Sequence, residues 1–266
     1  MRYLSTSIHY IFLIVQPQIG AFRNRFGHGY NMRCPVSVVH NSGLATEGRL
    51  LKVDIDWFGQ SCFRLKEGNI TVVTDPYDKS IGYTLPKLRA DLVTISHDAP
   101  GHAHAAAIKG DPKVLTRPGE YEVKSVFVTG IQTWRGPTAK GEAKQENTVF
   151  VFEFGDLTAC HLGDLSRLLT QAQVESMPDI HVLLVPVGGG SALDADKAAE
   201  VIAQLEPRIV IPMHYHTQYT TLKLDPIAKF LKEMGAAEHE PQDSVRVTRS
   251  QLPEETQVVV LECKQG

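Results

Sequence analysis

The alternation of apolar and polar residues that marks folded structure begins near residue 51. Residues 53–58 alternate, which predicts a strand with one buried face, and Gly59-Gln60-Ser61 predicts the turn that ends it. Residues 62–65 and 70–74 predict two more strands. Residues 91–95 form a short β-branched and apolar run, as expected of a strand that is buried on both faces.

The rest of the chain continues this pattern and adds helices. Further strands are predicted at residues 113–115, 126–130, 148–154, 157–161, 181–186, 208–212 and 257–263. Helices are predicted at residues 170–177, 194–205 and 225–234, with Thr170 and Asp194 as N-caps of the first two. A strand-rich first half followed by alternating strands and helices predicts a layered α/β (α+β) fold in which helices pack on sheets.

Residues 1–50 differ from the rest of the chain. They mix Arg, Asn, Gly and isolated aromatic residues without sustained periodicity, so we expect a poorly ordered N-terminal extension and a single domain at residues 51–266. The longest apolar run near the start, Ile11–Val15, is too short to span a bilayer. No clean apolar run with a small-residue cleavage site follows the start, so a secretory signal peptide is not expected either.

Composition narrows the class of protein further. Hydrophobic residues make up 42% of the 266, which is enough to bury a core, and the formal net charge is −3. A slightly acidic chain has no broad phosphate-binding field, so no nucleic acid partner is expected. The four cysteines lie far apart without a CxxC pair, which is typical of reduced thiols in a cytoplasmic protein.

Polar side chains that can bind metal follow three of the predicted buried strands. They are His97 to His104 after residues 91–95, His161 to Asp164 at the end of residues 157–161, and His214 to His216 after residues 208–212. Strand ends hold such groups rigidly, and imidazole and carboxylate are zinc-compatible ligands. A lone histidine or aspartate at a strand end is more often structural, so each segment alone is a weak signal. His161, inside an apolar strand, is expected to support the core, and His104 is expected on the surface.

The chain from about Val53 onward resembles the metallo-β-lactamase-fold hydrolases, and most closely the small metal-dependent hydrolases of that superfamily. The resemblance rests on Trp57–Arg64, Thr74–Tyr77, Ser96–Asp98, Gly119–Val123, Asn147-Thr148, His161–Leu165, Pro186–Gly189 and Ile211–Tyr215, in the family's order along the chain. It implies an αββα sandwich of the metallo-β-lactamase type, with two sheets face to face, helices outside and a metal site at one edge between the sheets.

The family's HxHxDH metal motif is incomplete in this chain. His97 matches its first histidine and His102 its last, but Ala99 stands in place of the second histidine and Gly101 in place of the aspartate. Residues 131–135, where relatives often carry another histidine ligand, contain none, and Gln60 replaces a histidine common in the first turn.

Other parts of the family's site are present. By the same resemblance, Asp164 matches the bridging carboxylate and His214 the last histidine ligand. We therefore expect one metal ion rather than two, held by His102, Asp164 and His214 with His97 close by. Three protein ligands and a water make a workable catalytic zinc shell. Zinc is the expected metal, with iron and manganese as alternatives. A further alternative is that the site binds no metal.

Two functions follow, and a third is considered remote. In the first, the protein is a metal-dependent hydrolase in which a metal-bound hydroxide attacks an ester, amide, lactone or phosphoester of a small-molecule substrate, with Asp164 and Asp98 as the catalytic carboxylates. Asp98 could act as a base or orient a ligand. In the second, the replacement of metal ligands at Ala99 and Gly101 has removed activity, and the fold is a non-catalytic binding or scaffold module. A nucleotide site at Gly188–Gly190 lacks both common phosphate-loop patterns.

Overall fold

The computed structural model describes residues 51–136, 145–236 and 240–266. The expected poor order of residues 1–50 therefore lies outside the described residues. Within these ranges the chain forms two β-sheets, and both carry residues of the functional site.

The first sheet is built from the N-terminal half of the domain and one late strand. Its strands lie in the order β12-β1-β2-β3-β4-β5. They are β12 (Val245–Thr248), β1 (Lys52–Trp57), β2 (Phe63–Glu67), β3 (Ile70–Thr74), β4 (Leu92–Thr94) and β5 (Lys113–Leu115). The pairs from β12 to β3 are antiparallel, whereas β3, β4 and β5 run parallel. Consequently β1, β3 and β4 end at the same edge of the sheet.

The second sheet has the order β13-β11-β10-β9-β8-β7-β6. Its strands are β13 (Gln257–Val258), β11 (Ile209–Met213), β10 (Val182–Pro186), β9 (Leu157–His161), β8 (Gln145–Phe154), β7 (Val126–Arg135) and β6 (Gly119–Val123). Strands β9, β10, β11 and β13 are parallel, and the others are antiparallel. Every residue of β9, β10 and β11 is buried, as the continuous apolar runs predict.

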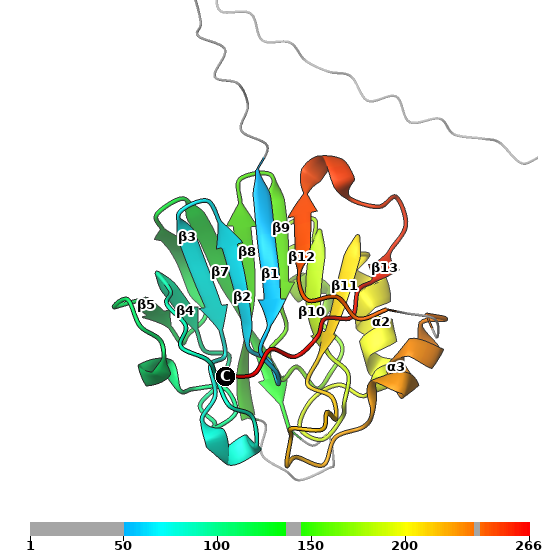
Figure 1. The fold of residues 1–266 in the computed structure, drawn as a ribbon. Coiled ribbons are helices and arrows are strands. Elements are labelled where there is room, and N and C mark those ends of the chain that lie inside the picture. The colour runs from blue at the N-terminus through cyan, green and yellow to red at the C-terminus, as the bar shows by residue number, and fades with distance from the viewer. Residues whose placement is uncertain (1–50, 137–144, 237–239) are drawn as a thin grey trace, which may run out of the picture. The chain divides into compact units, whose positions relative to one another are not determined.

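The two sheets face each other and share one core (Figure 1). Large side chains from both sheets fill it, among them Trp57 and Phe63 from the first and Phe150 and Phe152 from the second. The helices α2 (Ala195–Leu205) and α3 (Ile227–Glu233) lie beside β10 and β11, on the outside of the second sheet (Figure 1). The predicted two-sheet sandwich of the metallo-β-lactamase type is confirmed.

The outer face of the first sheet is covered differently from what an αββα sandwich implies. Val73 and Val93 on that sheet pack in a second buried cluster with Tyr77, Tyr83 and Ile108 from the intervening loops. The regular structure in these loops is limited to two 3-10 segments, η1 (Lys79–Ile81) and η2 (Ala105–Ala107). In the described residues, loops therefore replace α-helices on this side.

Most predicted elements agree with the structure to within a few residues. The short helix α1 (Gln171–Glu175) has Thr170 as N-cap in a capping box, and Asp194 caps α2 by accepting a hydrogen bond from the Lys197 amide. The predicted last strand is shorter than expected, because only Gln257–Val258 pairs with β11. Strands β6 and β12 were not predicted.

The chain beyond β13 crosses from the second sheet to the first. The amide of Val259 still bonds to the carbonyl of Val210 in β11, but Cys263 bridges to Trp57 at the end of β1. The amides of Lys264 and Gly266 then bond to the carbonyls of Trp57 and Thr84. Figure 1 shows this segment, in red, passing across the strands to the C-terminus. It ties the two sheets together.

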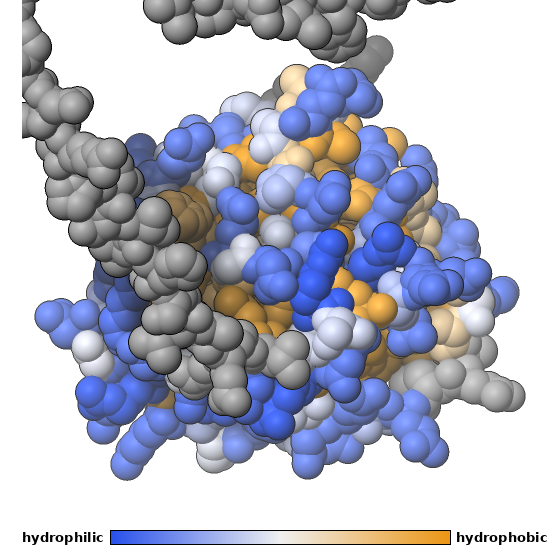
Figure 2. Space-filling model, turned by 90° about the horizontal axis from the view of Figure 1, so that it is seen from above, coloured by the Kyte–Doolittle hydropathy of each residue, from blue (hydrophilic) through white to orange (hydrophobic). Residues whose placement is uncertain are grey.

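The end of the sandwich seen from above is mostly hydrophilic, with apolar residues showing between the polar ones (Figure 2). The site described below lies at the opposite end, at the bottom of Figure 1. Among the described residues, no helix has the length and apolar character needed to cross a membrane.

Candidate metal centre

Four strands deliver polar side chains to one end of the sandwich. Asp75 follows β3 and His97 follows β4 in the first sheet, while Asp164 follows β9 and His214 follows β11 in the second. Strands β3 and β4 are parallel neighbours, and β9 and β11 are both parallel to β10 between them, so within each sheet the carboxyl ends meet at one edge. The facing of the two sheets brings the two edges together.

Asp164 stands at the centre of three histidines. Its Oδ1 lies 3.3 Å from Nε2 of His102 and 3.3 Å from Nε2 of His214. Its Oδ2 lies 3.7 Å from Nε2 of His97. One ligand atom each from His97, His102 and Asp164 all fall within 4.8 Å of one another. The structure thus brings together all four residues that the sequence proposed as metal ligands.

The donor set fits a divalent metal ion. Three imidazoles and a carboxylate converge, and none of the four residues is more than 8% exposed. Two atoms that face the centre, Asp164 Oδ1 and His97 Nε2, are buried without a hydrogen-bond partner among the described residues. Buried polar atoms are rarely left unpaired, so an electron-pair acceptor such as a metal ion would satisfy both.

Asp75 fixes which nitrogen of two histidines carries the proton. Its Oδ2 accepts a hydrogen bond from the Ser96 hydroxyl at 2.5 Å and lies 2.8 Å from His102 Nδ1. The Ser96 oxygen is in turn 3.0 Å from His97 Nδ1 and can accept from it. Both Nδ1 atoms are therefore placed as donors, which leaves both Nε2 lone pairs directed at the centre. Metal-binding histidines are commonly oriented by such a carboxylate.

Burial and neighbouring charges shift the pKa values of these groups. Burial lowers the pKa of His97 to about 3, and His102 adds to the shift, so the His97 imidazole is neutral near pH 7. Burial likewise lowers the pKa of His214. Burial acts to lower the pKa of His102 too, but Asp164 and Asp75 outweigh it and raise that pKa.

The Asp164 carboxyl is held in its ionised form. Burial by itself would raise its pKa, but His214, His102 and His97 together lower the pKa well below its usual range. Ionised carboxylate and neutral imidazole are the forms that bind metal. The raised pKa of His102 means that a metal ion would have to displace a proton from that ring.

The backbone around the centre is strained at positions that the site needs. His214 has a φ of +52°, and its amide bonds to the carbonyl of Gln60 in the turn between β1 and β2. Gly163 has a φ of +58°, and a Cβ there would lie 2.5 Å from both Asn147 Oδ1 and Ser96 Cβ. Only glycine fits at residue 163 without displacing these neighbours. Strain of this kind is typical of functional sites.

Asn147 of β8 holds the loop that carries Asp164. Its Oδ1 accepts a hydrogen bond from the Asp164 amide at 2.9 Å. Its Nδ2 donates to the Leu162 carbonyl at 3.0 Å and to Thr133 Oγ1 at 2.7 Å. The side chain therefore positions the carboxylate from the neighbouring strand.

At Gly101, where the family's motif has an aspartate, the surroundings leave room for a Cβ. A Cβ at Gly101 would lie 3.7 Å from Ile81 Cδ1 and 3.8 Å from Gln60 Nε2, which is ordinary contact. Gln60 is buried, and its Oε1 has no hydrogen-bond partner among the described residues. A side chain at residue 101 would therefore start without a clash, next to the buried Gln60 amide.

The other residues singled out from the sequence lie outside this cluster. Asp98 is exposed, next to His97, at the rim of a cavity. His104 and His216 are exposed as well. His161 is fully buried, with its Nε2 2.9 Å from the Ser61 carbonyl, and so supports the core as expected.

Sequence reasoning missed three groups around the carboxylates. Asp75 was noted only as part of Thr74–Tyr77, and its position directly after a buried strand was the available signal. The Ser191 hydroxyl donates to Asp164 Oδ2 at 2.7 Å, and Arg135 Nη1 lies 3.9 Å from the same oxygen. Neither residue lies in a segment whose pattern marks it.

A cavity of about 760 Å³ opens beside the cluster. His97 and Arg135 line it, together with Asp98, Arg117, Gln132 and Glu146. A small molecule in this cavity would reach the centre past His97 and Arg135.

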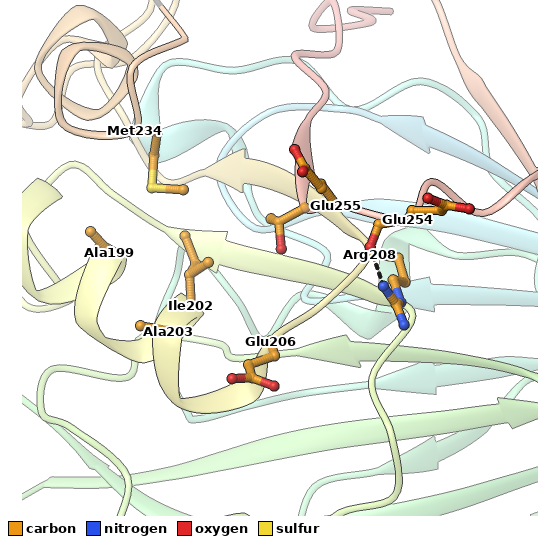
Figure 3. A pocket seen from close by; sticks show the side chains of 9 residues that line it. Ala199, Ile202, Ala203, Glu206, Arg208, Met234, Glu254 and Glu255 are labelled. Carbon is orange, nitrogen blue, oxygen red and sulfur yellow. Dashed lines mark hydrogen bonds between the residues drawn. The ribbon is translucent and has the colours of Figure 1, made fainter.

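A second hollow, of about 550 Å³, lies between α2 and the loop before β13 (Figure 3). Ala199, Ile202 and Ala203 of α2 line one wall, and Arg208, which bonds to the Glu254 carbonyl, lines the other (Figure 3). Its lining has no histidine or cysteine, and among the described residues its glutamates form no group that could hold a metal ion.

Comparisons with known proteins agree with this geometry. A family model described as a beta-lactamase superfamily domain matches residues 54–214. The chain is 30% identical over 198 residues to a metal-dependent hydrolase of Nanoarchaeum equitans, covering 65% of this chain and 87% of the relative. It is 27% identical over 202 residues to a metal-dependent hydrolase of Thermoplasma acidophilum, covering 65% of this chain and 87% of that relative. A crystal structure of a candidate Zn-dependent hydrolase of the metallo-β-lactamase superfamily from Thermotoga maritima matches with 39% identity and a TM-score of 0.64, over 79% of this chain and 98% of that one.

Proposed function

The chain belongs to the metallo-β-lactamase superfamily, and from this premise we propose that it is a metal-dependent hydrolase acting on a small molecule. The membership confirms the resemblance drawn from the motif residues. Relatives from Nanoarchaeum equitans and Thermoplasma acidophilum are named metal-dependent hydrolases, which supports the same class of reaction here.

One observation carries the proposal. Nε2 of His102 and Nε2 of His214 both approach Oδ1 of Asp164 at 3.3 Å, and that oxygen has no hydrogen-bond partner among the described residues. Since His102 Nδ1 is held by Asp75, its Nε2 is the nitrogen that faces the carboxylate oxygen. A divalent ion between them would displace the proton that the raised pKa of His102 keeps on that ring, and it would bind both atoms.

His102, His214 and Asp164 would hold the ion, with His97 beside them. A divalent ion there supplies Lewis acidity and can lower the pKa of a bound water to about 7. Zinc, iron and manganese all accept imidazole and carboxylate ligands, and zinc is our first expectation. Asp75 orients His97 and His102, and Asn147 fixes Asp164.

The cavity of about 760 Å³ is the proposed substrate site. Its size suits a small molecule, and its position beside His97 brings a scissile ester, amide, lactone or phosphoester bond to the centre. We propose Asp98, exposed at its rim, as the group that takes up or returns a proton during the reaction.

Metal content is the decisive test. Elemental analysis of protein purified without chelator should give close to one zinc, iron or manganese per chain. The variants Asp164→Asn and His214→Ala should each lose metal uptake but keep the circular dichroism spectrum of the fold. His216→Ala is the matched control, because His216 is exposed two residues beyond His214 and should bind metal as the parent does.

A non-catalytic binding module is the alternative, and the replaced motif positions Ala99 and Gly101 favour it. Metal content near zero, with no thermal shift when zinc is added, would support the module and contradict the hydrolase. If Asp164→Asn and His214→Ala alter stability only, these residues are structural.

A further inference from the structure

The two oxygens of Asp164 lie in different surroundings. Oδ1 faces His102 and His214 at 3.3 Å each and lacks a hydrogen bond among the described residues. Oδ2 accepts a hydrogen bond from Ser191 at 2.7 Å, lies 3.9 Å from Arg135 Nη1 and also lies 3.7 Å from His97 Nε2. The carboxylate therefore has an open side and a side already supplied with donors and positive charge.

Arg135 supplies that positive charge from the end of β7. Its side chain is 16% exposed, and Asp164 is the one carboxylate within 4.0 Å of its guanidinium in the ranges that the structure describes. A guanidinium does not lose its proton in proteins, so the charge is permanent. Asp164 is ionised and nearly fully buried, which gives the pair little screening by solvent.

We propose that the Arg135 guanidinium is a built-in cation on the Oδ2 side of Asp164 that competes with metal and restricts the centre to one ion, on the Oδ1 side. The inference rests on the proposed function only in taking a divalent metal as the competing ligand. Arg135 acts through Asp164 and is a positioning residue. Its positive charge offsets the negative charge of Asp164 Oδ2, which a second metal ion would need for binding.

The physical reason is repulsion between like charges in a partly dry site. A second divalent ion near Oδ2 would lie beside the guanidinium, and even an ion near Oδ1 shares the same carboxylate with it. Charges only several ångströms apart repel each other strongly at the effective dielectric of a protein site, so removing Arg135 should strengthen metal binding by about tenfold or more.

Calorimetric titration of metal-free protein with zinc, together with elemental analysis, tests this. The parent should bind one zinc. Arg135→Met, which keeps length and removes charge, should bind zinc at least about tenfold more tightly or take up a second ion. Arg135→Lys restores a cation and should return both affinity and stoichiometry to near the parent values.

Arg117→Met is the matched control. Arg117 lines the same cavity but is exposed and forms no ion pair with Asp164 within the described residues, so the loss of its charge should change zinc affinity by less than about threefold. Thermal melts establish that each variant folds, and Arg135→Gln takes the place of Arg135→Met if the latter does not.

Each outcome decides the inference separately from the proposed function. If the parent binds one zinc and Arg135→Met binds equally or less tightly, Arg135 is not a competing cation, while the metal centre stands. If only Arg135→Met binds zinc, the inference holds and the hydrolase proposal for the parent fails. If neither binds zinc, both are wrong.

Discussion

Asp75 is a single residue on which two histidines of the centre depend. Its Oδ1 accepts from the Ser96 amide at 2.7 Å, and its Oδ2 serves both the Ser96 hydroxyl and His102 Nδ1. It is fully buried at a φ of +38°, a conformation that few residues adopt outside special sites. Burial by itself would raise the pKa of the Asp75 carboxyl, but the hydrogen bond with His102 and the charges of His161, His102 and His97 together lower it.

We expect Asp75→Asn to weaken metal binding by about 10–100-fold, as is typical for a group that orients ligands. An asparagine keeps the size of the side chain, but its NH₂ group would oppose a donor from Ser96 or His102. The measurement is calorimetric zinc titration at pH 7.5. Asp91→Asn is the control, since Asp91 bonds to the Thr71 amide and Lys124 away from the centre. An affinity within twofold of the parent would contradict the role of Asp75.

At the scale of elements, β8 and the β9 loop act as one unit through Asn147. Replacing Asn147 by Ala leaves the buried Asp164 amide without its partner and removes one of the two hydrogen bonds made by the Leu162 carbonyl and by Thr133 Oγ1. An unpaired buried group costs about 1–3 kcal/mol, so the free energy of unfolding should fall by at least about 1 kcal/mol. Urea denaturation of the metal-free protein measures this.

The same variant should also bind zinc more weakly, because the loop that carries Asp164 loses its anchor. A fall of less than about 0.5 kcal/mol in the free energy of unfolding would mean that water replaces the lost bonds and that Asn147 is not an anchor. Zinc affinity separates the two effects, because a purely structural role lowers stability and leaves the affinity unchanged.

The elements that position the centre were predictable because their sequence pattern is local. Strands β4, β9, β10 and β11 are mostly apolar and fully buried, and polar residues lie at or just after the ends of β4, β9 and β11. Strand β6 was missed because it is an edge strand with mostly exposed side chains, and β12 because its alternation of Val with polar residues extends over only four residues. Their existence depends on pairing with β7 and β1, which the local sequence does not encode.

The same distinction applies within the site. His97, His102, Asp164 and His214 could be proposed because each follows or matches a recognisable strand end or motif. Arg135 could not, since its role comes from a contact with Asp164 across the sheet. Side-chain partners that are distant in sequence become visible only when the fold is known.

For the whole molecule, the centre depends on the two sheets keeping their relative position. His97 and His102 come from the first sheet, Asp164 and His214 from the second, and the bond from the His214 amide to the Gln60 carbonyl links the sheets at that end. The C-terminal segment links them again through Lys264, whose ammonium lies 2.6 Å from buried Asp56. Folding therefore assembles the centre, and it also buries several ionisable histidines.

This burial predicts how the stability of the metal-free protein depends on pH. The pKa of His97 is lowered to about 3, chiefly by burial, and burial also lowers those of His161 and His214. Their ordinary value is about 6.5, so below it the unfolded chain takes up protons that the folded protein refuses, and stability falls as the pH drops. His102, with a raised pKa, opposes this, because its contribution is complete below 6.5 and is lost as the pH rises.

The pKa is lowered for three of these histidines, His97, His161 and His214, and raised only for His102. The free energy of unfolding should therefore decrease from pH 7 toward pH 5. The slope approaches about 1.4 kcal/mol per pH unit for each net proton taken up on unfolding. Urea denaturation in the presence of chelator at pH 7, 6 and 5 measures it. His97→Asn removes one of the lowered groups and should flatten the dependence by nearly one proton. A stability that is constant or rises toward pH 5 would mean that these imidazoles are hydrated and charged in the folded protein, which is incompatible with the dry, neutral ligand set that a metal centre requires.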